Sequence, residues 1–285
     1  VRLVGSEMCI RDSDKGDTKY GTTGFGNRFT DDMCWISLTL IRLSEATGDD
    51  TYINMAKTLY DTQIITRAWE DEKGKGLPWK ELSVDKTRNA CTNAPGCLVA
   101  AKLYLKFKDA KYLADAKILC AYVNANILKS DYRVGEPPLT YTQGTFGEAC
   151  RQLYHITQEQ SYMAIAEQVI SYAFTSTRCT NKGFLRDEGT DMNQSIFKAV
   201  LIPYAVNLVL DDAASGTVRN TLTLKLQDNA EALRKNMDRT QWPAMYCNYY
   251  WGSSFNSANI ASMGAQASGA SLMEGVARLE AAQAK

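Results

Sequence analysis

The stretch "LYLKFKDAKYLADAKILCAY", residues 103–122, decides the fold because its pattern occurs three times in the chain. The other copies are "LSEATGDDTYINMAKTLYD", residues 43–61, and "LYHITQEQSYMAIAEQVISY", residues 153–172. In each copy a leucine is followed nine positions later by a tyrosine and thirteen positions later by an alanine. Apolar residues three and four positions apart indicate α-helix rather than strand. The repeated unit is therefore predicted to be a helix, a short turn and a second helix.

Each copy also carries an acidic residue three positions before its tyrosine, namely Asp49, Asp109 and Glu159. An acidic side chain there can accept a backbone N–H of the following helix, so these residues are predicted N-caps. Further helical runs follow at 193–210, 218–237 and 257–281. Extended alternation is scarce, and we therefore predict an all-α chain.

Repeated helical hairpins either stack into an open solenoid or close into an (α/α) toroid. A solenoid has shorter and more uniform linkers than this chain, whose hairpins are separated by long loops rich in Gly, Trp, Tyr, Asn and Asp. Long loops of this kind commonly carry binding and catalytic residues. The prediction is one (α/α)6 toroid or barrel spanning residues 14–285, with these loops on one face.

The composition is that of an ordinary globular protein, with 45% hydrophobic and 22% charged residues. The 32 basic and 32 acidic residues cancel, so the chain lacks the electrostatic footprint of a nucleic-acid or anionic-membrane binder. No apolar stretch approaches the roughly 18 residues that a membrane span needs. The sequence therefore predicts neither a nucleic-acid partner nor a membrane span, and it does not indicate an oligomeric state.

The chain has one histidine, His155, which largely excludes chemistry built on imidazole. This residue falls near the end of a predicted helix, where a cation is favourable, and we interpret it as structural. The eight cysteines show no CxxC spacing, and those within apolar helical runs are interpreted as small hydrophobes. No metal cluster, phosphate-binding glycine loop or nucleotide fingerprint appears, so no cofactor is implied. Catalysis here would fall to carboxylates.

The first 13 residues, "VRLVGSEMCIRDS", match neither a signal peptide nor a helix start. We interpret residues 1–13 as a non-native, adaptor-like leader joined to a gene fragment. No export signal is visible in this chain.

Two adjacent aspartates, Asp31 and Asp32, open an apolar helical run in "RFTDDMCWISLTL", residues 28–40. Helix capping explains each acid singly, because Thr30 would be the N-cap and acids in the first turn suit the helix dipole. A catalytic pair is the alternative. Vicinal carboxyl groups can lie about 5 to 5.5 Å apart, the separation found in retaining glycosidases, and crowding of like charges raises one pKa. These residues alone leave both interpretations open.

Residue types that bind sugars are frequent in the loops. An aromatic ring offers a flat apolar surface to the C–H face of a sugar, and nearby Asn, Gln and Asp side chains bind its hydroxyl groups. Ordinary packing beneath a loop explains any one such ring equally well. The aromatic residues in question are Trp35, which follows the aspartates closely, and Trp69, Trp79, Tyr141, Trp242, Tyr249, Tyr250 and Trp251.

Five ordered motifs resemble glycoside hydrolase family 76, the endo-acting α-1,6-mannanases and related mannan-processing enzymes. They are "TDDMCWISL", "GLPWK", "RNACTNAPGCLVAAKLY", "TYTQGTFGEACRQLY" and "SIFKAVLIPYAV", with a looser match through "YYWGSSFNSANIASMGAQASGA". The resemblance implies an (α/α)6 barrel that hydrolyses α-1,6-linked mannose backbones with retention, using an adjacent aspartate pair. It also implies α-mannan as the polysaccharide partner and a secreted, periplasmic or cell-surface location.

By this resemblance, Asp31 is the expected nucleophile and Asp32 the expected general acid/base. The resemblance also implies that Asn93 lines the cleft and that Gly144 allows close approach of the backbone to substrate. With the loop aromatics included, the expected substrate-binding residues are Trp35, Trp79, Asn93, Tyr141, Gln143 and Trp251.

Family members carry one or more helices before the aspartate pair, so the resemblance also implies an N-terminally truncated chain that lacks its first helix. A truncated chain would expose apolar surface and be less stable than an intact member. Besides hydrolysis, two functions stay open. They are transfer of mannose-containing glycans by the same fold and noncatalytic carbohydrate binding by a helical-repeat scaffold.

Overall fold

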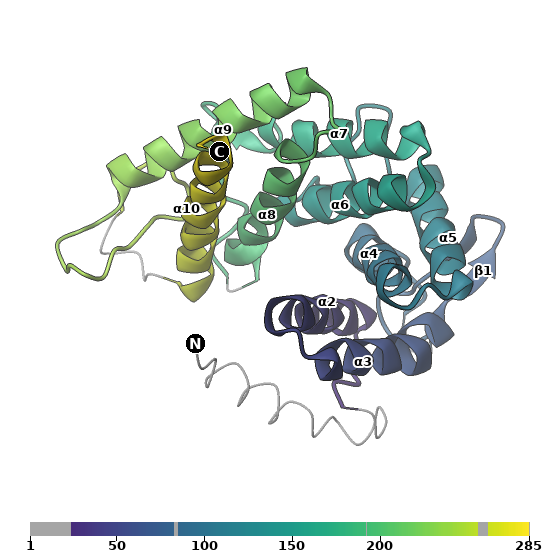
Figure 1. Cartoon of the computed structure of the whole chain (residues 1–285). Coiled ribbons are helices and arrows are strands. Elements are labelled where there is room, and N and C mark those ends of the chain that lie inside the picture. The colour runs from purple at the N-terminus through teal and green to yellow at the C-terminus, as the bar shows by residue number, and fades with distance from the viewer. Residues whose placement is uncertain (1–23, 83–84, 192, 256–261, 285) are drawn as a thin grey trace. The chain divides into compact units, whose positions relative to one another are not determined.

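A computed structural model describes residues 24–82, 85–191, 193–255 and 262–284 (Figure 1). The chain divides into two compact units, Val1–Ile127 and Leu128–Lys285. The first unit contains α2 (Thr30–Thr47), α3 (Asp50–Leu59), α4 (Ala90–Phe107) and α5 (Ala110–Asn126). The second contains α6 (Thr140–Thr157), α7 (Gln160–Thr175), α8 (Phe197–Val209), α9 (Gly216–Asn236) and α10 (Met263–Gln283). The predicted leader lies outside the described residues and stays a prediction.

Three helical hairpins confirm the predicted repeat, because α2 packs on α3, α4 on α5 and α6 on α7 (Figure 1). In each hairpin the first helix ends on a residue in the left-handed region, and the second helix begins two residues later. The left-handed residues are Gly48 (φ 73°), Lys108 (φ 57°) and Gln158 (φ 63°). Glycine is the usual residue at such a C-terminus, because a side chain is strained there. The repeated alanines, Ala56, Ala116 and Ala166, are fully buried.

The predicted caps of the second helices are right in two hairpins and wrong in the third. Asp49 accepts the backbone N–H of Thr51 at 2.8 Å, and Asp109 accepts that of Lys111 at 3.0 Å. The side chain of Glu159 makes no capping hydrogen bond. Glutamate is one methylene longer than aspartate and is not among the favoured N-cap residues.

Two short antiparallel hairpins interrupt the helical pattern. Strand β1 (Trp69–Asp71) pairs with β2 (Gly74–Gly76), and β3 (Thr180–Asn181) pairs with β4 (Phe184–Leu185). A short 3-10 helix, Gln194–Ile196, precedes α8, and the turns after α3 are a π-helix, Tyr60–Ile64, and a 3-10 helix, Ile65–Arg67. Each β-hairpin lies in a loop between two helices, the first between α3 and α4 and the second between α7 and α8. Their strands are too short to give the alternating pattern by which a strand is predicted.

Gly144 packs one helix against another, whereas its approach to substrate stays a prediction. In the second unit, α8 contacts both α6 and α10 (Figure 1). A Cβ atom added at Gly144 on α6 would lie 2.8 Å from the Cα atom of Leu201 on α8. Glycine is therefore required for the close approach of these two helices.

Three carboxamide side chains hold loops against helices, an arrangement that the sequence did not reveal. Each is the fourth residue of its helix, and each binds both the N–H and the C=O of one loop residue. The pairs are Asn93 with Leu77 (2.7 and 3.0 Å), Gln143 with Val134 (3.2 and 3.1 Å) and Gln266 with Cys247 (3.0 and 3.0 Å). A carboxamide offers one acceptor and donors in one plane, so it satisfies both backbone groups as a strand neighbour would.

Candidate active site

The start of α2 is fixed by a short pairing with loop residues that follow much later in the chain, Trp79 and Lys80. Phe29 and Lys80 form an isolated antiparallel bridge, and the backbone N–H of Thr30 donates to the carbonyl of Trp79 at 2.8 Å. This pairing places Trp79 beside the first turn of α2, where Asp31 and Asp32 lie.

Thr30 is not the N-cap, which corrects the capping interpretation. The N-cap position belongs to Phe29, which has no side-chain capping hydrogen bond. Thr30 is fully buried as the first helical residue, and its hydroxyl accepts a hydrogen bond from Arg67 at 3.3 Å. Capping therefore does not account for the polar residues at this helix start.

The carboxylate of Asp31 is held by two donors from other parts of the first unit. Its Oδ2 accepts the indole N–H of Trp79 at 3.2 Å and the thiol of Cys91 at 3.6 Å. Its Oδ1 is buried and has no hydrogen-bond partner among the described residues. Burial raises the pKa of Asp31 to about 6, the charge of Asp32 adds to the rise, and the two hydrogen bonds partly oppose it.

Asp32 lies at the surface beside Asp31. Its Oδ2 accepts the amide of Asn27 at 3.2 Å. Partial desolvation raises the pKa of Asp32, and the Asn27 hydrogen bond partly opposes that rise. The unit thus presents two adjacent carboxyl groups in different surroundings, which is the pattern of an acid and base pair.

Cys91 is the residue of this site that sequence reasoning missed. It lies in the first turn of α4, is not in a disulfide, and had no role predicted from the sequence. Its thiol instead donates to Asp31, sixty positions earlier in the chain. Only its place two residues before Asn93, in the same motif, could have drawn attention to it.

Two aromatic residues expected to bind substrate lie close to the aspartates. Besides donating to Asp31, Trp79 packs its ring against Phe29, with centroids 5.5 Å apart. The ammonium group of Lys80 lies 4.2 Å from the centroid of the Trp79 ring. Trp35 is half-buried on α2, one helical turn after Asp31. These rings are placed near the carboxylates, and their contact with substrate stays a prediction.

Asn93 does not line an open cleft, which corrects its expected role. The side chain is fully buried, and its amide binds the N–H and C=O of Leu77 and the C=O of Asn89. Because Leu77 lies two residues before Trp79, Asn93 fixes the loop that carries the indole donor. Its role is positional.

Asn93→Leu is expected to lower the free energy of unfolding by about 2 to 3 kcal/mol, because two buried backbone groups of Leu77 lose their partners. Urea denaturation measures this change. The matched control is Asn126→Leu, which removes a partly exposed amide from the carbonyls of Lys73 and Tyr122 and should cost less than about 1 kcal/mol. Equal losses in the two variants would contradict the positional role.

Tyr141 and Gln143 belong to the second unit, at the start of α6. The ring of Tyr141 packs against that of Phe197, with centroids 4.3 Å apart. Gln143 is fully buried and bound to Val134, so we correct its expected substrate contact to a positional role. Glu188 accepts the backbone N–H of Thr140 at 2.7 Å and so satisfies a free donor of the α6 N-terminus.

Trp251 is a buried packing residue, which also corrects an expected substrate contact. Its side chain is 1% exposed, and the ammonium group of Lys198 lies 4.2 Å from its ring centroid. Burial lowers the pKa of Lys198 to about 8, and the charges of Glu188 and Asp187 oppose that change. A sugar would have to displace this packing to reach the indole.

The described residues contain no group of three or more His, Cys, Asp or Glu side chains that could hold a metal ion. Of the helices in this part of the chain, none is long and apolar enough to cross a membrane.

The sequence profile of glycosyl hydrolase family 76 matches residues 7–284. The chain belongs to this family. A comparison with curated protein sequences gave no match.

Solved structures, several of them of family 76 enzymes, resemble this chain over most of its length. The α-1,6-mannanase GH76A from Salegentibacter sp. HEL1_6 has 26% identity and a TM-score of 0.80, and the match covers 92% of this chain and 79% of that one. A second structure is an inactive variant of that mannanase in which two consecutive aspartates are replaced by asparagine, in complex with α-1,6-mannotriose. It has 26% identity and a TM-score of 0.79, and the match covers 89% of this chain and 77% of that one. The Lin0763 protein from Listeria innocua has 24% identity and a TM-score of 0.78, and the match covers 89% of this chain and 73% of that one. The matches to family 76 structures confirm the predicted all-α, (α/α)6 fold class.

Proposed function

We propose that this family 76 chain is a retaining glycoside hydrolase that cleaves α-1,6-linked mannan backbones with Asp31 and Asp32. The observation that carries the proposal is the adjacent pair itself, in which Asp31 has a raised pKa and two fixed donors. The similar mannanase is inactive when two consecutive aspartates are replaced and then holds a mannotriose, which supports the same use of an aspartate pair here. The polymeric substrate further supports a secreted, periplasmic or cell-surface location.

In this mechanism Asp31 is the nucleophile and Asp32 the general acid/base. Both donors to Asp31 bind Oδ2, so the rotamer is fixed while Oδ1 keeps its lone pairs for the sugar's anomeric carbon. Asp32, the more exposed of the two, can protonate the leaving oxygen and then activate water. The pKa of Asp31 is nevertheless raised to about 6, which is also the order expected of a proton donor. The assignment within the pair therefore needs its own test.

Azide rescue separates the two roles. We expect Asp31→Ala, assayed on an aryl α-mannoside with azide, to yield a glycosyl azide of inverted configuration, because azide replaces the nucleophile. Asp32→Ala should yield a glycosyl azide of retained configuration, because azide then attacks a glycosyl-enzyme intermediate. Proton NMR of the products reads the configuration, and the opposite pattern would exchange the two roles.

The direct test of the function is incubation with linear, debranched α-1,6-mannan and chromatography of the products. An endo-acting hydrolase releases a ladder of oligosaccharides, and the first product detected by NMR has the α configuration if the mechanism retains it. Release of no product from α-1,6-mannan would contradict the proposal. Adding an acceptor sugar tests for glycan transfer, whereas binding without turnover would indicate a carbohydrate-binding scaffold.

The activity should have a bell-shaped pH dependence with its upper limb near pH 6. In either role assignment the active pair holds one proton, and the pair loses that proton as the pH passes the Asp31 pKa of about 6. Measuring kcat/KM from pH 3.5 to 8 checks this expectation. A profile that stays flat from pH 5 to 8 would show that the pair does not titrate in the catalytic cycle.

Cys91→Ala should lower kcat/KM by about 3- to 10-fold, because the carboxylate of Asp31 loses one donor. Loss of that donor also raises the pKa of Asp31, so the upper limb of the pH profile should shift to higher pH. Cys91→Ser keeps a donor and should retain most of the activity. Cys120→Ala is the matched control, because Cys120 is a buried cysteine of the same unit whose sulfur accepts a hydrogen bond from the Asn124 amide at 3.8 Å. Identical pH profiles for Cys91→Ala and the unmodified chain would contradict a positioning role for the thiol.

A further inference from the structure

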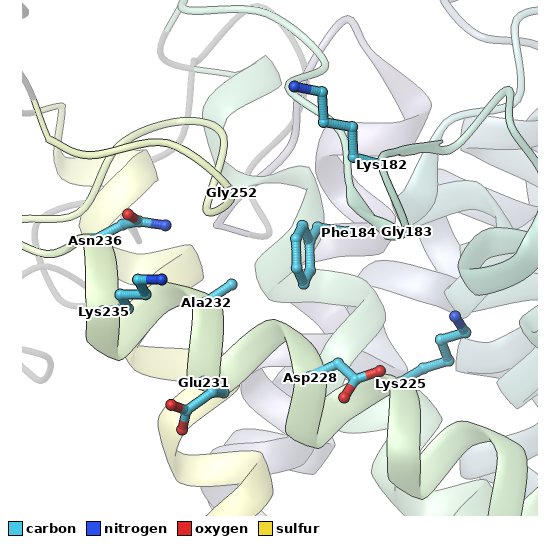
Figure 2. Close-up of a pocket in the computed structure, with 10 residues that line it drawn as sticks. All are labelled: Lys182, Gly183, Phe184, Lys225, Asp228, Glu231, Ala232, Lys235, Asn236 and Gly252. Carbon is cyan, nitrogen blue, oxygen red and sulfur yellow. The ribbon is translucent and has the colours of Figure 1, made fainter.

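A pocket of about 710 Å³ lies on the second unit, between α9, the β3–β4 hairpin and the loop at Gly252 (Figure 2). This volume falls within the range of about 300 to 1,000 Å³ that is usual for small-molecule sites. All of its lining residues belong to the second unit, whereas Asp31 and Asp32 belong to the first. The pocket is therefore built without the aspartate pair.

Hydrogen bonds join the walls of this pocket to one another. They run from Leu185 N–H to Asn229 Oδ1 (3.0 Å), from the Tyr250 hydroxyl to the carbonyl of Asn181 (2.6 Å) and from Asn236 Nδ2 to the carbonyl of Trp251 (2.9 Å). The first bond joins the β3–β4 hairpin to α9. The second joins this hairpin to the loop at Gly252, and the third joins that loop to α9. The pocket is thus preformed, which reduces the ordering that a ligand must impose.

Charged side chains of both signs line the pocket without pairing. Helix α9 contributes Lys225, Asp228, Glu231 and Lys235 at spacings of three and four residues, and the hairpin contributes Lys182. Residues so spaced on a helix commonly form ion pairs. Within the described part of the chain, these five side chains make no ion pair or hydrogen bond, so their donors and acceptors are available to a ligand.

The ring of Phe184 supplies an apolar surface within this polar setting. Figure 2 shows it facing Ala232 and Asp228 on α9, with Lys235 and Asn236 on one side. An anionic ligand would meet Asp228 and Glu231, and a cationic ligand would meet the lysines. A neutral sugar meets no such repulsion, because its hydroxyl groups accept from ammonium groups and donate to carboxylates while its C–H face packs on the ring.

We propose that this pocket is a second carbohydrate site, which binds a short neutral oligosaccharide segment of the polymer that the aspartate pair cleaves. The proposal rests on the proposed function for the identity of that polymer. A second site holds the chain on a long substrate and adds to the overall affinity through effective concentration. It is not required for the cleavage of a short soluble oligosaccharide.

The test follows the backbone amide signals of Gly183 and Gly252 by NMR in the Asp31→Asn chain during titration with α-1,6-mannotetraose. We expect saturable shifts at both glycines. Phe184→Ala and Lys235→Ala should each weaken this binding at least fivefold, and the exposed position of Lys235 makes its variant safe for folding. Leu224→Ala removes a 62% exposed side chain of α9 outside the pocket and should change nothing.

Three outcomes would each overturn the proposal. They are no shift at Gly183 and Gly252, shifts in both pocket variants equal to those of the chain with Phe184 and Lys235 intact, and saturable shifts with inorganic phosphate instead of the oligosaccharide. The turnover assay of the otherwise unmodified chain keeps the two proposals apart. Phe184→Ala should leave cleavage of short oligosaccharides within twofold and slow cleavage of polymeric mannan. If the chain cleaves mannan but the amide signals of Gly183 and Gly252 do not shift, only the proposal of a second site is contradicted. If these signals shift but the chain cleaves no mannan, only the proposed hydrolase is contradicted.

Discussion

Asp31→Asn is expected to lower kcat on α-1,6-mannan by at least about 1,000-fold, because an amide cannot form the covalent glycosyl ester that a retaining mechanism requires. The fold should stay intact, since an asparagine oxygen still accepts the indole N–H of Trp79. The measurement is turnover by reducing-end assay, with circular dichroism as the check on folding. Near-full activity in this variant would exclude Asp31 from the chemistry.

The same substitution should also stabilise the chain above pH 6. The folded-state pKa of Asp31, about 6, lies above the ordinary value of 3.8, so Asp31 costs stability progressively as the pH rises from about 4 to 6. A shift of about two pKa units corresponds to about 3 kcal/mol, which partial exposure reduces to about 2 kcal/mol. Asparagine does not ionise and therefore avoids that cost.

Thermal melts of both proteins at pH 4 and pH 8 measure this effect. Asp31→Asn should melt several degrees higher at pH 8, and the two melting temperatures should converge at pH 4. Asp85→Asn is a matched control, since Asp85 is a half-buried aspartate of the same unit whose pKa is lowered, not raised, by hydrogen bonds from Thr87. A pH-independent difference for Asp31→Asn would show that its carboxylate is not desolvated as the structure indicates.

Arg151→Leu is expected to destabilise the chain by about 3 to 5 kcal/mol, the usual cost of leaving a buried charge without its partner. Arg151 on α6 binds both carboxylate oxygens of Glu148, at 2.8 and 2.9 Å, and donates to Asp211 at 2.7 Å. The side chain of Glu148 is 1% exposed. His155 also binds Asp211, at 2.5 Å, which agrees with its interpretation as a structural residue.

Urea denaturation measures this loss, and two further variants decide its origin. Arg178→Leu removes a bidentate partner of Glu136 at the surface, where the side chains are 43% and 52% exposed, and should cost less than about 1 kcal/mol. Glu148→Leu combined with Arg151→Leu should recover much of the stability, because the Glu148 carboxylate is then gone and Asp211 keeps His155 as a partner. Failure of that recovery would assign the loss to packing instead.

The helical fold class and the aspartate pair were predictable from the sequence because both are local signals. A helix places residues three and four positions apart on one face, so the spacing that buries Ala56, Ala116 and Ala166 is visible in the chain itself. Asp49 and Asp109 cap their helices through donors two residues away, which is also a local relation. Neighbouring carboxylates such as Asp31 and Asp32 need no tertiary structure to be recognised.

The surroundings of that pair were decided only by tertiary structure. The donors to Asp31 come from 48 and 60 positions away, and no local pattern states that an indole and a thiol will meet one carboxylate. For the same reason Asn93, Gln143 and Trp251 were expected to contact substrate, although the structure buries them against distant backbone or a lysine. The sequence by itself determined which residue types are present and which helices form. Burial, and with it the pKa of Asp31 and the choice between contacting and positioning residues, depends on packing between distant segments.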